Sequence, residues 1–457
     1  MLSRGEQEVR YEERHSSFSS GTEGETSRSV RIQIVLAVMA ILQAVWLGGI
    51  WQTGTAASSW KLPQLLGYSL LCAFVVAFLP TALLSNGKRG EKRVTEDPRL
   101  VRAAFGFIAI VGCLYAYCQR GWPDEQAVFA TSRIVAEQGV GPFFADYAHI
   151  PWLGTQHPPL AILMYGFALR VFGSALIVIR LLAFFLSLGI LWLTYRLGCE
   201  LYDREHGVLA AGCLLVMPFF FRLGATALND VPISFCFVLA TWLTLRLLQT
   251  PSYRRAMATG LCVGAGLLCK YTMVLVYPVI LTAYALNGQY RRLLPYVLVM
   301  MLTSGCIFGL WVDYAVNHGI FPSQFAFLGR YAMHVIGTSG GKKWLFQVLV
   351  FRLPSGIGVS HLPLLLFGGW KLLQRWLWPD LFVLGWISAV FFPLLLTLPG
   401  PRYFFPAFPA LAIVIAQGLT QLGSEMERVA LLALLYWGGA LYLFVDWYQA
   451  AGGWFYH

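Results

Sequence analysis

The sequence predicts an all-α polytopic membrane protein, and three observations support this fold class. Apolar residues make up 58% of the 457 residues, and mean hydropathy is +0.63. Charged residues make up only 12%, about half of the roughly 25% that a soluble domain carries to keep its surface hydrated. Long apolar runs alternate with short basic segments, as expected for a chain that crosses a bilayer repeatedly.

Thirteen apolar runs meet or approach the roughly 20 residues that a membrane-spanning helix needs. They are residues 32–51, 62–84, 103–119, 175–197, 207–224, 231–248, 256–269, 271–287, 294–312, 346–369, 379–397, 403–421 and 429–447. The two runs on either side of Lys270 are short, which makes them the least regular members of the series.

Lys and Arg residues set the expected orientation, because they accumulate in cytoplasmic loops. With a cytoplasmic N-terminus, the tail and the loops 85–102, 196–206, 246–255, 288–293, 370–376 and 422–428 hold 21 of the 33 Lys and Arg residues. We therefore expect a cytoplasmic N-terminus and an external C-terminus.

We expect the chain to be divided into four regions. Residues 1–31 are rich in Ser, Glu, Gly and Arg and are expected to form a disordered cytoplasmic tail. Residues 32–102 would form an additional transmembrane hairpin and a basic cytoplasmic loop. Residues 103–425 would form the main transmembrane domain, and residues 426–457 the last span and the external C-terminus.

The main domain contains a long external loop at residues 120–174. Within it, residues 124–139 have the pattern of an amphipathic helix. Residues 157–172 are apolar, but a helix of this length extends only about 24 Å, too short to cross a bilayer comfortably. We expect both segments to be helices that lie at the outer membrane interface.

Several other classes of function are disfavoured. The net charge of +11 comes from basic loops between apolar runs, so it indicates orientation in a membrane and no nucleic-acid partner. The nine cysteines include no CxxC pair, and nearly all lie in or beside apolar runs, where small side chains pack well. His149 and His157 lack the spacing of a zinc motif, so no metal ligand is assigned.

Acidic residues outside the cytoplasmic loops are few, and charge is costly in a membrane, so each is a candidate functional residue. Asp124 and Glu125 directly follow Trp122-Pro123, and Asp230 follows Asn229 where one span ends and the next begins. Both positions fall on the external face. The alternative is that these carboxylates only stabilise helix N-termini.

Basic residues on the same face are candidates for binding an anion. Lys270 lies between two short apolar runs, where its side chain either extends to the interface or pairs with an anion. Arg402 and Tyr403 follow Pro401 at the start of a span, and a guanidinium there suits a phosphate, which it can bind through two hydrogen bonds. The other cationic candidates on this face are His157, Arg330, Lys342, Lys343 and Arg352.

Several of these motifs recur in the order found in one family. They are Trp122-Pro123-Asp124-Glu125, Gly154-Thr155-Gln156-His157-Pro158-Pro159-Leu160, Phe172-Gly173 with Arg180, Asn229-Asp230, Gly266-Leu267-Leu268-Cys269-Lys270-Tyr271-Thr272, and Pro401-Arg402-Tyr403 with Pro406 and Pro409. Over roughly residues 103–425 the chain resembles the polyprenyl-phosphate-sugar-dependent glycosyltransferases of the GT-C membrane fold. Within them it is similar to the protein O-mannosyltransferase and lipid A aminoarabinose transferase group.

The resemblance implies an inverting glycosyltransferase that uses a polyprenyl (undecaprenyl or dolichyl) phosphate sugar at the external face. Asp124 matches the family's general base, Glu125 its usual companion, and Asp230 a second external acidic position. These three are the expected catalytic residues. The residues 103–425 then form the catalytic domain, with its catalytic loop at 120–174.

The resemblance also implies a site for the lipid-linked phosphate. Lys270 and Arg402 match basic residues that contact it, and His157 stands where some relatives have a lysine. The further substrate-binding candidates are Asn229, Arg330, Tyr331 and Tyr403. The chemistry requires no cofactor, because fixed cations neutralise the leaving group. Distant relatives with paired acidic residues use a divalent ion, so metal dependence stays open.

A polytopic secondary transporter or lipid-sugar flippase is the competing class. Such proteins keep ionisable residues near the middle of the bilayer on broken helices, whereas these residues lie at expected helix ends on one face. The sequence leaves open which sugar is moved and whether the acceptor is a lipid, a glycan or a protein. The bacterial inner membrane is the expected location, because no retention signal occurs.

Overall fold

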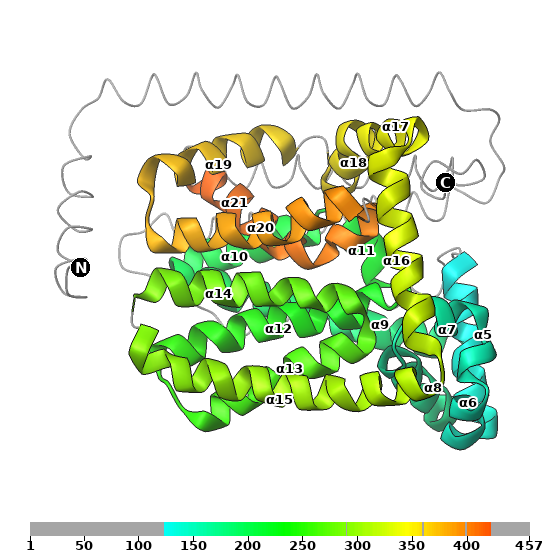
Figure 1. Ribbon diagram of the computed structural model, residues 1–457. Coiled ribbons are helices and arrows are strands. Elements are labelled where there is room, and N and C mark those ends of the chain that lie inside the picture. The colour runs from blue at the N-terminus through cyan, green and yellow to red at the C-terminus, as the bar shows by residue number, and fades with distance from the viewer. Residues whose placement is uncertain (1–122, 289, 359–360, 398–399, 422–457) are drawn as a thin grey trace, which may run out of the picture.

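The computed structural model describes residues 123–288, 290–358, 361–397 and 400–421, and the statements below concern these residues. Every regular element within them is a helix (Figure 1), which confirms the all-α part of the prediction. The expected tail and the expected spans 32–51, 62–84, 103–119 and 429–447 lie outside the described residues. The total of thirteen spans therefore stays a prediction.

Five helices are long and apolar enough to cross a membrane. They are α9 (Leu176–Leu201), α12 (Asp230–Gln249), α15 (Tyr290–Asn317), α20 (Trp378–Thr397), and the segment in which η7 (Pro401–Ala407) continues into α21 (Phe408–Thr420). A sixth candidate is bent by 69° between α10 (Arg204–Leu215) and α11 (Pro218–Gly224). The bend occurs where Met217 precedes Pro218, because the proline ring disfavours helical backbone at the residue before it.

The two short runs around Lys270 form separate helices. α13 (Tyr253–Cys269) ends directly before Lys270, whose backbone is extended. The one-turn helix η4 (Tyr271–Leu275) and α14 (Val276–Asn287) follow. Lys270 therefore lies at a helix end, as expected from the sequence.

The prediction of a single span at residues 346–369 is wrong. The structure instead has α17 (Ser339–Gln347), a π-helical turn η5 (Val348–Arg352), α18 (Leu353–Ile357) and α19 (Leu362–Arg375). Gly358 ends α18 with a φ of 101°, a backbone conformation that side chains with a Cβ rarely adopt. Mean hydropathy over the run does not detect such a break.

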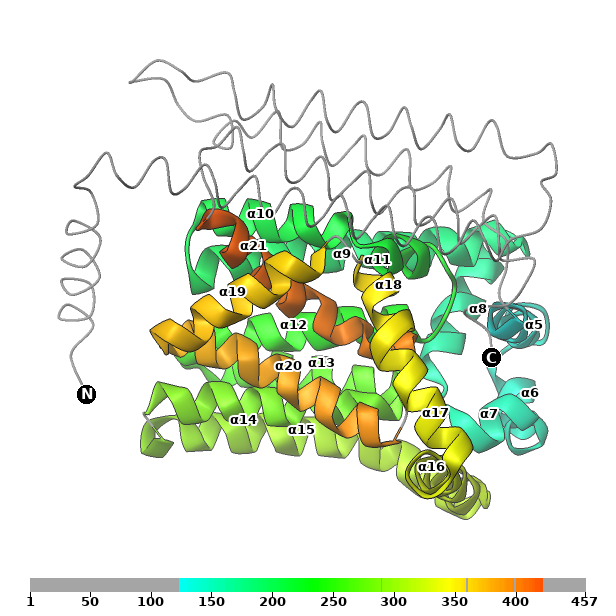
Figure 2. The same cartoon turned by 90° about the horizontal axis from the view of Figure 1, so that it is seen from above.

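The long loop folds into helices at one end of the bundle. Figures 1 and 2 show α5 (Pro123–Gln138), α6 (Val140–Ala145), α7 (Pro151–Gln156) and α8 (Leu160–Phe172) together there, with α16 (Ile320–Gly337) running across the same end. The helix expected at 124–139 is confirmed as α5. The one expected at 157–172 starts only at Leu160, after Pro158 and Pro159. Val135 of α5 packs so closely on Gly166 that a Cβ at Gly166 would lie 2.5 Å from it.

The opposite end of the bundle is fixed by a buried carboxylate. Asp380, at the start of α20, is fully buried and accepts hydrogen bonds from Tyr202 Oη (2.8 Å) and Arg375 Nη2 (2.6 Å). These contacts tie the ends of α9 and α19 to α20. Paired in this way, the buried charge is tolerated.

Candidate active site

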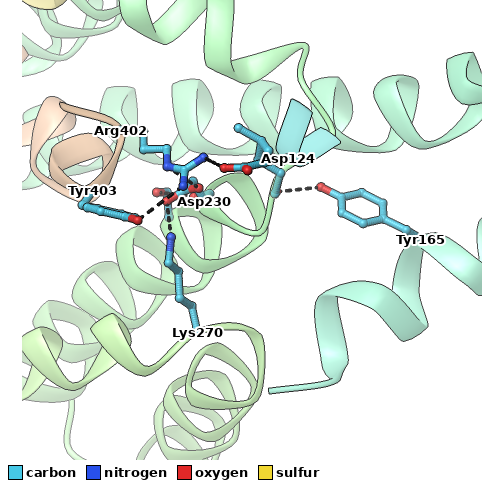
Figure 3. Close-up of polar contacts among 8 residues, drawn as sticks. Asp124, Tyr165, Asp230, Lys270, Arg402 and Tyr403 are labelled. Atoms are coloured by element: carbon cyan, nitrogen blue, oxygen red, sulfur yellow. Dashed lines mark hydrogen bonds and ion pairs between the residues drawn. The ribbon is translucent and has the colours of Figure 1, made fainter. Parts of the chain in front are cut away.

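Four charged side chains from four elements meet at the end of the bundle that carries α5–α8 (Figure 3). Asp124 lies in the first turn of α5, Asp230 begins α12, Lys270 follows α13 and Arg402 lies in η7. The chain turns back between α12 and α13, so the start of one helix and the end of the other fall at the same end. We call these four residues the charged cluster.

Arg402 connects the two carboxylates of the charged cluster. Its Nη1 forms an ion pair with Asp124 Oδ2, and its Nε lies 4.0 Å from Asp230 Oδ2. Lys270 Nζ donates to Asp230 Oδ1 at 2.6 Å. Two carboxylates and two cations give the cluster a formal charge of zero, which reduces the cost of placing it at a membrane.

Tyr403 contacts both cations of the charged cluster. Lys270 Nζ lies 4.2 Å from the centroid of its ring, a cation–π distance. Arg402 Nη2 donates to Tyr403 Oη at 3.3 Å. The phenol thus contacts both groups that the sequence predicts to bind a phosphate.

The charged cluster is more exposed on one side than on the other. The side chains of Asp230 and Lys270 are only 6% and 7% exposed, whereas those of Arg402 and Asp124 are 23% and 39% exposed. A reactant that approaches from solvent or from the lipid surface therefore meets Asp124 and Arg402 first.

Two hydrogen bonds position the start of α12 and therefore Asp230. Tyr165 Oη donates to the Leu228 carbonyl at 3.0 Å (Figure 3), and the Ala227 N–H donates to Glu125 Oε1 at 2.9 Å. α5 and α8 of the loop thereby hold the segment that precedes Asp230.

Glu125 contacts a different set of residues from Asp124. It is fully buried, and Arg180 donates to both of its carboxylate oxygens, at 2.9 and 2.6 Å. Successive residues of an α-helix point about 100° apart, which explains why Asp124 reaches Arg402 and Glu125 does not. These contacts join Glu125 to Arg180 and to the segment before α12 instead of to the charged cluster, and its expected catalytic role stays a prediction. The partner could have been anticipated, because Arg180 is a charged residue near the start of an apolar helix.

His157 lies in the loop before α8, packed against the Trp152 ring at 4.6 Å between centroids. Its carbonyl accepts hydrogen bonds from Tyr147 Oη (2.6 Å) and Gln324 Nε2 (3.3 Å), which fix the loop. Burial, together with the nearby charges of Lys270 and Arg402, holds the pKa of His157 well below its usual range. The imidazole is therefore neutral at pH 7, so His157 does not supply the titratable cation expected from the sequence.

Asn229 is buried beside Asp230, and neither its Oδ1 nor its Nδ2 has a hydrogen-bond partner among the described residues. A buried amide without partners is costly. Asn229 therefore has hydrogen-bonding capacity available for a bound molecule.

The last two candidates lie elsewhere. Arg330 is exposed on α16, and no contact among the described residues joins it to the charged cluster. The side chain of Tyr331 lies outside what the structure describes. Within the described ranges, no group of three or more His, Cys, Asp or Glu side chains is arranged to hold a metal ion.

The described helices have the fold of the GT-C class of multi-pass membrane proteins, as two solved structures indicate. The chain is similar to the crystal structure of ArnT from Cupriavidus metallidurans in the apo state, with a TM-score of 0.55, 17% identity and 76% of each chain covered. It is also similar to ArnT from the same organism bound to undecaprenyl phosphate, with a TM-score of 0.53, 14% identity, and 76% of this chain and 77% of that one covered. Identities this low show likeness of fold.

A more particular likeness comes from the sequence. Residues 156–312 match the family model described as dolichyl-phosphate-mannose-protein mannosyltransferase. No curated protein matches the chain. The resemblance inferred from the ordered motifs is thereby confirmed.

Proposed function

We propose that the chain is an inverting glycosyltransferase that moves a sugar from a polyprenyl phosphate to an acceptor at the external face of the membrane. One observation carries the proposal: an accessible carboxylate, Asp124, is paired with Arg402, and Arg402 and Lys270 both lie at Asp230, at one end of a GT-C bundle. The match to the mannosyltransferase family and the fold shared with a protein crystallised with undecaprenyl phosphate support it.

The donor phosphate would bind at Lys270, Arg402 and Tyr403. Negative charge develops on this phosphate as the sugar leaves, and preorganised cations in a partly buried site stabilise that charge more than water does. The free amide of Asn229 and the neutral imidazole of His157 would bind the sugar hydroxyls. The lipid tail would lie in the outer leaflet.

Asp124 would act as the general base. Its carboxylate takes the proton of an acceptor hydroxyl or amine, and the acceptor atom forms a bond to the anomeric carbon. The bond from that carbon to the phosphate oxygen breaks, and its electron pair stays on the phosphate. Attack occurs opposite the leaving group, so the anomeric configuration is inverted.

The proposed topology places the charged cluster outside and the N-terminus in the cytoplasm. The opposite end of the bundle carries the basic loops, including Arg246, Arg254 and Arg291, as cytoplasmic loops do. The bacterial inner membrane is the proposed location, and lipids, glycans and proteins are the acceptor classes to test.

A purified protein in detergent, supplied with labelled sugars on undecaprenyl and dolichyl phosphate, tests the function. Release of free polyprenyl phosphate together with transfer of the label to an acceptor extract is the expected result. A secondary transporter or flippase would leave every donor intact, so the absence of turnover with the whole panel would contradict the proposal.

Lys270→Met and Arg402→Lys are each expected to raise the donor KM or lower turnover. Methionine keeps the apolar stem and removes the charge, whereas lysine keeps the charge and loses the planar guanidinium. A charge-assisted hydrogen bond is worth about 1.5–3 kcal/mol. Because both groups contact one phosphate, the double variant should be non-additive by about 0.5–3 kcal/mol.

Donor kinetics of both single variants and the double variant check this prediction. Lys371→Met, at the opposite end of the bundle, is the matched control and should behave as wild type. Since Lys270→Met leaves Asp230 buried without its closest cation, the melting temperature of each variant must be measured beside the kinetics. Additive effects, or unchanged kinetics for Lys270→Met, would remove Lys270 from the donor site.

A further inference from the structure

Both cations of the charged cluster are already paired with carboxylates, so neither is free for an incoming phosphate. Lys270 is paired with Asp230 at 2.6 Å, and Arg402 contacts Asp124 directly and Asp230 at 4.0 Å. Beside them, His157 is uncharged at neutral pH. An anion that enters this site must therefore compete with a carboxylate for the cation with which that carboxylate is paired.

The two pairs differ in how easily they can open. Lys270 and Asp230 are almost fully buried, and the Tyr403 ring contacts the ammonium group. Asp124 is the most exposed member of the cluster, in the first turn of α5, and Arg402 is more exposed than Lys270. A displaced Asp124 carboxylate can be hydrated, whereas a displaced Asp230 would stay buried, and burying a charge without a partner is expensive.

We propose that the donor phosphate displaces Asp124 from Arg402, so that the base becomes available only after the donor has bound. The inference rests on the proposed function. In the structure Arg402 holds Asp124 in an ion pair, so the Oδ2 atom that faces the guanidinium is not free to accept a hydrogen bond from an acceptor. In the loaded site the guanidinium is shared with the phosphate, and Asp124 faces the acceptor. Arg402 is thus a positioning residue for Asp124 as well as a contact for the donor.

Two consequences follow for binding. The acceptor should be activated only in the presence of donor, which gives a compulsory order of donor first and acceptor second. In addition, Asp124 should compete with the phosphate. Removing its charge should therefore strengthen binding of the lipid phosphate, whereas removing an ordinary binding residue weakens it.

Binding of undecaprenyl phosphate to the purified full-length protein, by calorimetry or a thermal-shift titration, measures the competition. Asp124→Asn is expected to bind about fivefold more tightly than wild type, since a partly exposed ion pair is worth up to about 1 kcal/mol. Asp124→Ala should change binding in the same direction. Asp146→Asn removes an exposed carboxylate from the same loop and is the matched control, with wild-type affinity expected.

A double-mutant cycle distinguishes displacement from a general change of charge. Arg402→Gln should weaken binding more in the Asp124→Asn background than in wild type, because only in that background is the guanidinium fully available to the phosphate. Equal losses in both backgrounds, or Asp124→Asn affinity at or below that of wild type, would overturn the inference and leave the proposed function standing. If neither wild type nor Asp124→Asn binds undecaprenyl or dolichyl phosphate, the proposed function falls together with it.

Discussion

Replacing Asp124 by Asn is expected to lower sugar transfer by about 10²–10⁴-fold, the usual contribution of a general base. Asparagine keeps the size of the side chain but cannot accept the proton of the acceptor. The protein should fold normally, because Asp124 is partly exposed and, within the part of the chain that the structure describes, its ion pair is with Arg402. Such pairs contribute about 0–1 kcal/mol. Donor binding should not weaken, so the loss should appear in kcat.

Steady-state transfer rates at saturating donor, beside melting temperatures and gel-filtration profiles, measure the effect. Asp146→Asn, which removes an exposed carboxylate of the same loop, should keep the wild-type rate. A variant that retains more than about a tenth of wild-type turnover would show that Asp124 is not the base.

Replacing Glu125 by Ala is expected to destabilise the protein by about 3–5 kcal/mol, the usual cost of removing one partner from a buried ion pair. Glu125 is fully buried, accepts two hydrogen bonds from Arg180 and one from the Ala227 N–H, and so joins α5 to α9 and to the start of α12. Folded yield and melting temperature should fall together with activity.

The same helix offers a matched control. Glu137 is also paired with an arginine, Arg133, but on an exposed surface, so Glu137→Ala should change stability by no more than about 0.5 kcal/mol. If Glu125→Ala instead melts like wild type and loses only turnover, Glu125 is a catalytic residue, as the sequence resemblance implies.

Hydropathy predicts most of the long apolar helices, because runs such as 175–197 and 231–248 are continuous and form helices long and apolar enough to cross a bilayer. It fails at residues 346–369, where mean hydropathy is high but the run contains Pro354, Gly356 and Gly358. There the backbone breaks at Gly358, whose φ is 101°. Signals for the break were present in the sequence, and a window average conceals them.

The charged cluster could be anticipated for a different reason. Asp124, Asp230, Lys270 and Arg402 each stand at the end of an expected helix on one face, so alternation of spans brings them to one end of the bundle. The alternation of spans does not predict which carboxylate pairs with which cation. Asp124 and Arg402 are 278 residues apart, and the pairing depends on how helices rotate and pack.

The charge state of His157 could not be predicted from the sequence either. A histidine in place of a lysine is expected to be titratable, but its state depends on burial and on neighbours from α13 and η7. Likewise, adjacent acidic residues look like one motif in the sequence. The helix separates them, since Asp124 faces the charged cluster and Glu125 faces Arg180.

The anomeric configuration of the product tests the central claim most directly. NMR of the glycoside formed by the purified protein from a polyprenyl phosphate sugar of known configuration reports both transfer and stereochemistry in one experiment. We predict complete inversion at the anomeric carbon and no product from the Asp124→Asn variant above background. A product with retained configuration would contradict direct displacement with Asp124 as the base.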